Sequence, residues 1–223
     1  MNSKDKQNVK SKEEFCSSIG ISVKEAEKIL RSTCGGELLY FKSKGTPKER
    51  GIGQLIFAAI SNSRAGKIKN ILEMGTGDGT TTKIFTQLFP STKIYTVDLP
   101  PEDIDYSQYA LQYRGKLFND NISSPNIISV QNNTFALTDT IYADNFDLIW
   151  VDGGHRFPSV AWDAHIAYRA AAPGALVLFH DYKPGEPDVV KVINYVNAII
   201  KEEVYFVKDN VYEEHYIAYF TKE

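Results

Sequence analysis

The sequence predicts an α/β fold, with a doubly wound, mostly parallel sheet of seven strands, N-terminal helices and a C-terminal antiparallel hairpin at one edge. Three observations predict this fold class. Short apolar runs alternate with longer helix-like segments from residue 70 onward, which favours a parallel sheet covered on both faces. A glycine-rich turn follows the first run, and acidic residues stand where several later runs end.

The apolar runs predict five parallel strands, and two further runs predict the C-terminal hairpin. The strands are expected at Asn70–Met74, Lys93–Asp98, Asn126–Gln131, Phe146–Asp152, Ala175–Asp181, Val204–Lys208 and His215–Thr221. The helices between and after them are expected at Thr80–Phe89, Tyr106–Asp120, Thr134–Tyr142, Ser159–Ala172 and Val189–Lys201.

Two helical stretches are predicted before the first strand. From Lys12 to Arg31 the pattern indicates a helix or a pair of helices broken near Gly20, with Ser22 and Glu25 as a capping box. A second helix is predicted from Pro47 to Asn62, with Thr46 as its cap. Its apolar face would consist of Ile52, Leu55, Ile56, Ala59 and Ile60.

Composition limits the classes of function. The 223 residues are 43% hydrophobic and carry a net charge of only −3, so the total charge does not indicate nucleic-acid or membrane binding. Two cysteines, Cys16 and Cys34, form neither a disulfide framework nor a metal motif. A polar N-terminus and the lack of a long apolar run favour a cytoplasmic protein.

The glycine loop is the most informative motif. It follows a strand and precedes a helix, in the segment ILEMGTGDGT from Ile71 to Thr80. The dinucleotide fingerprint requires a glycine where Thr80 stands, so the match to that fingerprint is incomplete. Glu73 would be poorly placed beside a pyrophosphate, and it suits a ligand with ammonium and sulfonium groups.

The segment ILEMGTGDGTTT resembles the first motif of class I S-adenosylmethionine-dependent methyltransferases. The resemblance implies a Rossmann-like fold that binds S-adenosylmethionine. Asp98, which ends the strand IYTVD, is placed to accept hydrogen bonds from the ribose hydroxyls. Asn133 is either an adenine contact, as the family implies, or an ordinary turn asparagine. The expected cofactor-binding residues are Glu73, Gly75, Thr76, Gly77, Asp98, Asn133 and Asp152.

A second cluster follows the fourth and fifth strands. These end in FDLIWVDGGH and ALVLFHDY, so Asp152, His180 and Asp181 should meet Glu73 and Asp98 at one rim of the sheet. Carboxylates gathered in this way repel one another, and a bound cation is the simplest relief.

The pairing of these two motifs resembles sugar and macrolide O-methyltransferases of antibiotic pathways, which are related to catechol and caffeoyl-CoA O-methyltransferases. The resemblance covers about residues 46–200. It implies a divalent metal, usually magnesium, held by Asp152, His180 and Asp181. His180 departs from the carboxylate or carboxamide usual in that family. An imidazole there favours manganese, iron or zinc, or else a role in orienting a ligand.

The resemblance also implies a catalytic group. His155, with Asp152, is the expected catalytic pair, and His155 would open the next helix and act as general base. A capping or structural role is the alternative. Asp163 is expected to be a solvated helix residue, although it could orient His155. Trp150 and Trp162 are expected to pack in the core, and His165 and His215 receive no function.

These features predict an S-adenosylmethionine-dependent O-methyltransferase acting on a small-molecule hydroxyl of a sugar, polyol or catechol. Residues 1–45 would form a tail and helical extension, and residues 46–223 the methyltransferase domain. We expect no nucleic-acid or membrane partner, and a homodimer is the default oligomer. Two alternatives are a non-catalytic S-adenosylmethionine-binding module and a nicotinamide-dependent oxidoreductase, and Thr80 argues against the latter.

Overall fold

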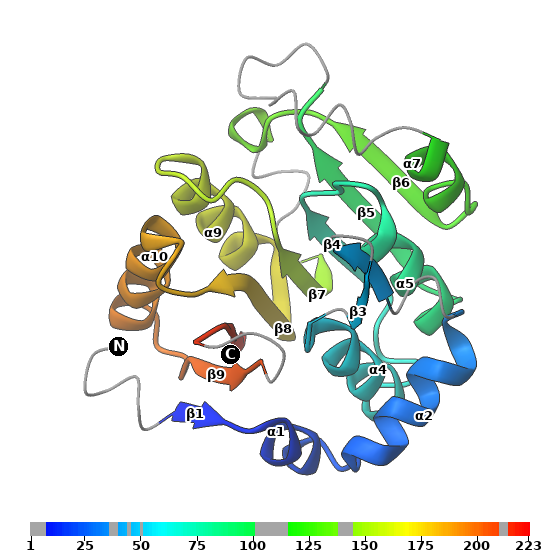
Figure 1. The fold of residues 1–223 in the computed structure, drawn as a ribbon. Coiled ribbons are helices and arrows are strands. Elements are labelled where there is room, and N and C mark those ends of the chain that lie inside the picture. Colours follow the sequence, from blue (N-terminus) through cyan, green and yellow to red (C-terminus); the bar gives the residue numbers. More distant parts are fainter. Residues whose placement is uncertain are drawn as a thin grey trace.

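The computed structural model describes residues 8–35, 40–43, 46–49, 51–100, 116–137, 145–209 and 214–223. Its main sheet has eight strands in the order β1-β9-β10-β8-β7-β4-β5-β6 (Figure 1). The strands are β1 (Val9–Lys10), β4 (Asn70–Met74), β5 (Lys93–Asp98), β6 (Ile127–Gln131), β7 (Phe146–Val151), β8 (Ala171–Tyr182), β9 (Tyr205–Lys208) and β10 (Tyr216–Thr221).

The predicted mostly parallel sheet is confirmed, with one strand more than expected. Strands β6, β5, β4, β7 and β8 run parallel, and β10 pairs antiparallel with both β8 and β9. The eighth strand arises because Val9 and Lys10 pair parallel with Phe206 and Val207 at the outer edge. A two-residue strand carries no alternating pattern that a sequence could reveal.

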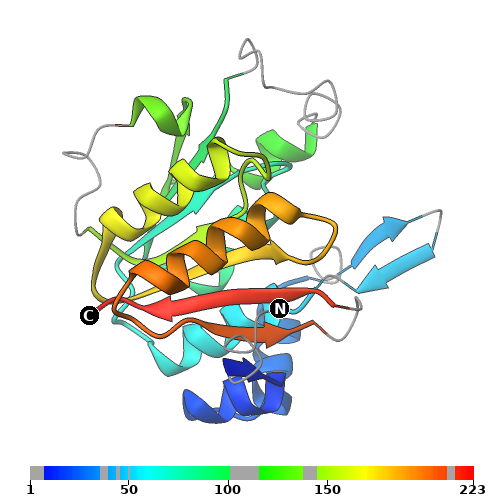
Figure 2. The same ribbon diagram turned by 90° about the vertical axis from the view of Figure 1, so that its left-hand side faces the viewer.

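Helices cover both faces of the sheet, as predicted (Figure 2). On one face lie α1 (Lys12–Ser18), α2 (Val23–Thr33), α4 (Gly53–Ser63) and α5 (Thr80–Leu88). The other face carries α9 (Ser159–Ala170) and α10 (Pro187–Ile199). The short helix α7 (Lys116–Asn121) and the 3₁₀ turn η2 (Thr134–Ala136) flank β6. No helix in the described part of the chain is long and apolar enough to cross a membrane.

The N-terminal helices form as the capping residues predict. Ser22 and Glu25 make the expected capping box at α2, and Ser11 and Glu14 make a second one at α1. Phe15, on α1, lies in the same apolar core as α4 and α5 and is 1% exposed. The domain boundary expected at residue 45 lies outside the described residues.

The helix expected from Pro47 begins later than predicted. Thr46–Glu49 is strand β3, which pairs antiparallel with β2 (Tyr40–Ser43), and α4 starts only at Gly53 without a side-chain cap. Both strands of a two-stranded sheet are edges, where proline is tolerated as readily as at a helix start. The predicted apolar face of α4 is nevertheless buried in full.

Two other helix predictions are tested only in part. Residues 101–115, most of the helix expected at Tyr106–Asp120, lie outside the described residues, and α7 covers its end. The helix expected at Thr134–Tyr142 is wrong at its start, because only the 3₁₀ turn η2 forms and the backbone is extended at Leu137. Residues 138–144 lie outside the described part.

Candidate active site

The glycine loop is closely packed between strands. Gly75 follows β4 with φ of 92°, and its N–H donates to Val97 O at 2.8 Å. A Cβ on Gly75 would lie 2.0 Å from the carbonyl oxygen of Asp152. The Asp152 N–H in turn donates to Met74 O at 2.8 Å. The loop after β4 and the end of β7 are therefore joined, and only glycine fits between them.

Asp98 binds the same loop. Its Oδ2 accepts from the Gly77 N–H at 2.9 Å, and its Oδ1 accepts from the Leu99 N–H at 2.8 Å. Gly77 has φ of 53°, and no atom of the described residues would lie within 4 Å of a Cβ at this position. The second predicted acidic position thus lies at the end of β5 and binds the glycine loop.

Glu73 lies beneath the loop and is fully buried. Its Oε2 accepts hydrogen bonds from Thr82 Oγ1 at 2.5 Å and Thr96 Oγ1 at 2.6 Å, whereas no described residue donates to its buried Oε1. Burial raises the pKa of Glu73 to about 8, against the effect of the two threonine hydrogen bonds. A ligand that carries positive charge above the loop would favour the ionised form of this carboxyl.

Glu73→Gln should reduce the pH dependence of stability. Between pH 4.5 and about 8 the folded protein keeps a proton on Glu73 that the unfolded chain has lost. This residue therefore lowers the free energy of unfolding by up to about 1.4 kcal/mol for each pH unit as pH rises through that window. Melting temperatures from pH 5 to 8 should fall less in Glu73→Gln than in the wild type or in the exposed control Glu13→Gln. An equal fall in all three would contradict this account.

Asn133 and Asp163 support the adjacent rim. Asn133 caps η2 by accepting from the Phe135 N–H at 3.0 Å, which is the turn role allowed in the sequence analysis. Asp163 is 3% exposed, so its expected solvated position is wrong. Burial raises its pKa to about 6, while hydrogen bonds from Thr134 and the Gly154 backbone oppose that rise. Asp163 thereby joins α9 to η2 and to the loop after β7.

The predicted residues of the second cluster come together. Asp152 Oδ1 lies 3.0 Å from His180 Nδ1, and His180 Nδ1 lies 3.4 Å from Asp181 Oδ1. His155 Nε2 lies 3.4 Å from Asp181 Oδ2 and 3.8 Å from Asp152 Oδ1. His155 does not open a helix as predicted, because α9 begins only at Ser159. It lies in the preceding loop, with Nδ1 3.4 Å from Glu186 Oε1.

Two members of the cluster were missed by the sequence analysis. His215 is 4% exposed, and its Nε2 lies 3.1 Å from Asp181 Oδ1. Its Nδ1 lies 3.2 Å from Oδ2 of Asp209, which is 1% exposed. Both residues border the turn between β9 and β10, and only the antiparallel pairing of β10 with β8 brings them to Asp181. The only sequence signal for their proximity was that they flank the turn of the predicted C-terminal hairpin.

Imidazoles and carboxylates alternate through this cluster. The histidines therefore compensate much of the negative charge that the sequence analysis expected from the carboxylates at the strand ends. Burial lowers the pKa of His180, but the attraction of Asp152 and Asp181 outweighs it and raises the pKa to about 10. Burial would raise the pKa of Asp181, yet hydrogen bonds from His180 and His215 hold it far below its usual range. Lys183 Nζ adds a contact of 2.7 Å to Asp181 Oδ1.

The neighbouring carboxylate of Asp152 raises the pKa of His155, although burial opposes the rise. The side chain of His155 is 30% exposed, which leaves it open to an incoming group. A partly exposed imidazole held between carboxylates can accept and hold a proton from a neighbouring hydroxyl.

The donor set fits a divalent metal. Two triads, Asp152–His155–Asp181 and His180–Asp181–His215, each place their ligand atoms within 4.8 Å of one another. Carboxylate oxygens and imidazole nitrogens are the usual ligands of manganese, zinc and iron. Asp152 and Asp181 are the two carboxylates expected from the sequence as metal ligands, and they lie in the same cluster.

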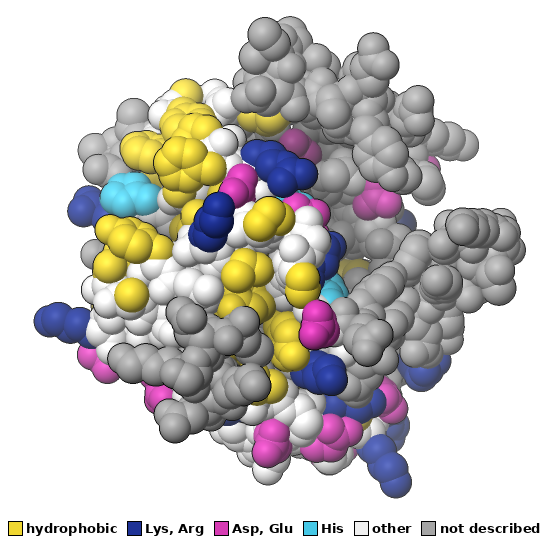
Figure 3. Space-filling view, turned by 60° about the vertical axis from the view of Figure 1, so that its left-hand side comes forward, with side chains coloured by type: hydrophobic (Ala, Val, Ile, Leu, Met, Phe, Trp, Pro, Cys, Tyr) yellow, Lys and Arg dark blue, Asp and Glu magenta, His cyan; other side chains and the backbone are white. Residues whose placement is uncertain are grey.

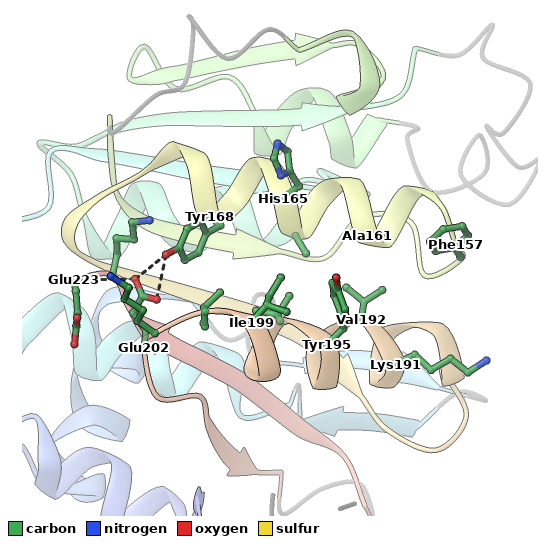
Figure 4. A pocket seen from close by; sticks show the side chains of 15 residues that line it. Phe157, Ala161, His165, Tyr168, Lys191, Val192, Tyr195, Ile199, Glu202 and Glu223 are labelled. Carbon is green, nitrogen blue, oxygen red and sulfur yellow. Dashed lines mark hydrogen bonds between the residues drawn. The ribbon is translucent and has the colours of Figure 1, made fainter. Parts of the chain in front are cut away.

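An apolar groove of about 950 Å³ lies elsewhere, between α9 and α10 (Figure 4). Phe157, Tyr195 and Ile199 are 70%, 65% and 60% exposed there, and hydrophobic side chains gather on this face (Figure 3). Tyr168 donates to Glu202 at 3.2 Å at one end of the groove. The groove lies on the outer side of the two helices and shares none of the clustered histidines and carboxylates.

A methyltransferase-domain family model matches residues 72–182, about half of the chain. That segment contains the glycine loop, Asp98 and the cluster from Asp152 to Tyr182. No curated protein sequence matches the chain significantly.

Solved structures share the fold at low sequence identity. One is the O-methyltransferase TomG from Streptomyces achromogenes, which is involved in tomaymycin synthesis and was solved with S-adenosylmethionine. It is 13% identical to this chain, with a TM-score of 0.54, and the match covers 90% of this chain and 89% of TomG. A candidate caffeoyl-CoA O-methyltransferase from Staphylococcus aureus is 16% identical with a TM-score of 0.55 over 88% and 91%.

Other structural relatives are longer than this chain. Spermidine synthase from Thermotoga maritima is 15% identical with a TM-score of 0.52, over 71% of this chain but only 55% of the synthase. The methyltransferase domain of the citrinin polyketide synthase is covered over 51% of its length. The shared fold therefore hosts more than one transfer reaction, and the family match rather than the fold indicates the chemistry. Residues 72–182 thus match a methyltransferase domain, and the described part of the chain has the class I methyltransferase fold of these solved structures.

Proposed function

We propose that this protein transfers the methyl group of S-adenosylmethionine to a hydroxyl of a small molecule, such as a sugar, polyol or catechol. One observation carries the proposal: the glycine loop and the histidine–carboxylate cluster are joined through the Gly75–Asp152 contact. A cofactor over the loop would therefore lie beside His155, the group proposed to take the proton from the substrate hydroxyl.

In this proposal, the glycine loop from Gly75 to Gly77 and Asp98 hold the cofactor. Glu73, beneath the loop, favours the cofactor's positive charge when it gives up its proton, and cofactor binding therefore promotes that ionisation. S-adenosylmethionine supplies an electrophilic methyl group on a sulfonium leaving group. The methyl–sulfur bond breaks as the acceptor oxygen forms its bond to the methyl carbon. His155 takes the hydroxyl proton, and Asp152 with Asp181 holds the ring of His155 in place through the contacts described above.

A divalent metal held by Asp152, His180 and Asp181 would lower the pKa of the acceptor hydroxyl and orient it. The resemblance to metal-dependent sugar and catechol O-methyltransferases supports this part of the proposal. His155, His180 and Asp181 occupy the rim of the sheet where ligands of such folds bind.

The test is an acceptor screen with S-adenosylmethionine, followed by mass spectrometry for S-adenosylhomocysteine and for acceptors heavier by one methyl group. Reactions in EDTA, Mg²⁺ and Mn²⁺ separate metal-dependent from metal-independent transfer. We expect turnover with at least one sugar, polyol or catechol. Cofactor binding without turnover over the whole panel would favour the non-catalytic module, and a change in nicotinamide fluorescence on mixing would favour the oxidoreductase.

A further inference from the structure

His215 lies deep beside the cluster, immediately before β10, which pairs with both β9 and β8. Its imidazole contacts two carboxylates, Asp181 through Nε2 at 3.1 Å and Asp209 through Nδ1 at 3.2 Å. Its ring also meets the His180 ring edge to face, with centroids 5.1 Å apart. His215 is therefore placed by the fold against the residues expected to hold a metal.

Asp209 is held firmly in position. Its Oδ2 accepts from the Ile52 N–H at 3.3 Å at the start of α4, and its own N–H donates to His215 O at 2.8 Å. A Cβ on Gly51 would lie 2.6 Å from that Oδ2, so the backbone of the preceding residue packs closely against it. A fixed carboxylate on Nδ1 is the arrangement that orients most metal-binding histidines.

This contact determines where the other ring nitrogen points. When Nδ1–H donates to Asp209, the lone pair of a neutral His215 ring faces Asp181 Oδ1, which is also an acceptor. Two acceptors at 3.1 Å need a cation between or beside them. The Lys183 ammonium already donates to Asp181 Oδ1 at 2.7 Å. The Nε2 lone pair still needs its own partner, which is either a proton or a metal ion beside both atoms.

The distances agree with a shared metal ion. Ligand atoms about 2.0–2.2 Å from one ion are roughly 3.0–3.5 Å from their neighbours in octahedral or tetrahedral geometry. His180 Nδ1 to Asp181 Oδ1 is 3.4 Å, Asp181 Oδ1 to His215 Nε2 is 3.1 Å, and the ligand atoms of these three residues all lie within 4.8 Å of one another. These atoms could therefore share one coordination sphere with little rearrangement.

We propose that His215 is a metal ligand together with His180 and Asp181, that Asp209 is its orienting carboxylate, and that the site prefers a divalent transition ion such as Zn²⁺ or Mn²⁺ to Mg²⁺. Two imidazoles among the ligands favour such ions, because Mg²⁺ selects oxygen ligands in near-ideal octahedral geometry. This inference deepens the proposed function by naming the class of metal at the same site.

The direct test is ¹⁵N NMR of the imidazoles, since the chain has only four histidines. Zn²⁺ should move the Nε2 resonance of His215 to a metal-bound position, with its Nδ1 still protonated, and it should leave His165 unchanged. Single histidine-to-glutamine variants assign the four pairs of signals. If both nitrogens of His215 keep imidazolium shifts with Zn²⁺ present in excess, His215 is a salt-bridged residue and the proposal is wrong.

Metal titrations provide a second readout. His215→Gln should weaken Zn²⁺ binding by about 100-fold, and Asp209→Asn by about 10–100-fold. His165→Gln is the matched control, because His165 is an exposed residue on α9, and it should bind Zn²⁺ as the wild type does. Circular dichroism would confirm folding of each variant. Equal Zn²⁺ affinity in folded His215→Gln and wild type, or tighter binding of Mg²⁺ than of both Mn²⁺ and Zn²⁺, would overturn the proposal.

S-adenosylmethionine binding in EDTA separates this inference from the proposed function. A protein that binds the cofactor but shows no His215–metal signal retains the methyltransferase proposal and loses the metal inference. A protein that binds the metal through His215 but never binds the cofactor retains the metal site and loses the proposed reaction.

Discussion

Gly75→Ala should destabilise the protein by about 3 kcal/mol or more and abolish cofactor binding. Gly75 has φ of 92°, and the new Cβ would meet the Asp152 carbonyl oxygen at 2.0 Å. Neither the loop nor β7 can retreat easily, because backbone hydrogen bonds join Met74 to Asp152 and Gly75 to Val97. Urea denaturation measures the loss of stability, and calorimetry measures cofactor binding.

Gly174→Ala is the matched control for the steric part of this prediction. Gly174 has a similar φ of 82°, yet no described atom lies within 4 Å of the position that its Cβ would take. The control therefore carries only the backbone penalty, about 1 kcal/mol. Equal losses of stability in the two variants would show that the Gly75–Asp152 contact does not restrict the site.

His155→Gln should lower kcat by about 10²–10⁴-fold, the usual contribution of a general base. The imidazole is partly exposed, and its Nε2 lies 3.4 Å from Asp181 Oδ2. Because His155 is not expected to hold the cofactor, the Kd for S-adenosylmethionine should stay within about twofold of the wild type. Steady-state kinetics with an acceptor from the screen, together with calorimetry, measure the two quantities.

His165→Gln serves as the control for His155→Gln. The exposed His165 ring lies 5.2 Å from the Trp162 ring on α9, and the same substitution there should leave kcat unchanged. A loss smaller than tenfold in His155→Gln, with the fold intact, would mean that another group or the solvent accepts the proton.

Much of the sheet could be predicted from local patterns, because each central strand is a short apolar run that ends in a polar or turn residue. Asn70–Met74 and Lys93–Asp98 have the bounds expected from the sequence. Pro47 shows where such patterns fail, since the same fixed φ suits a helix start and an edge strand. Strand pairing, not local preference, decided between them.

The residues of the candidate site also differ in whether local sequence patterns could place them. Asp98, Asp152, His180 and Asp181 could be placed because they lie at or near the ends of strands that share one rim. His215 and Asp209 could not, because their approach to Asp181 depends on the order of β9, β10 and β8 at the sheet edge. Asp163 was assigned to solvent because helical spacing alone does not show which face of α9 meets the loop after β7.

The central claim is that the glycine loop and Asp98 hold S-adenosylmethionine, and isothermal titration calorimetry tests it most directly. The account predicts micromolar binding by the wild type in EDTA. Asp98→Ala should weaken this binding at least about 100-fold, because it removes the ribose acceptor and the carboxylate that binds the Gly77 N–H at 2.9 Å. No binding heat with folded wild-type protein, in EDTA or in Mg²⁺ or Mn²⁺, would contradict the account.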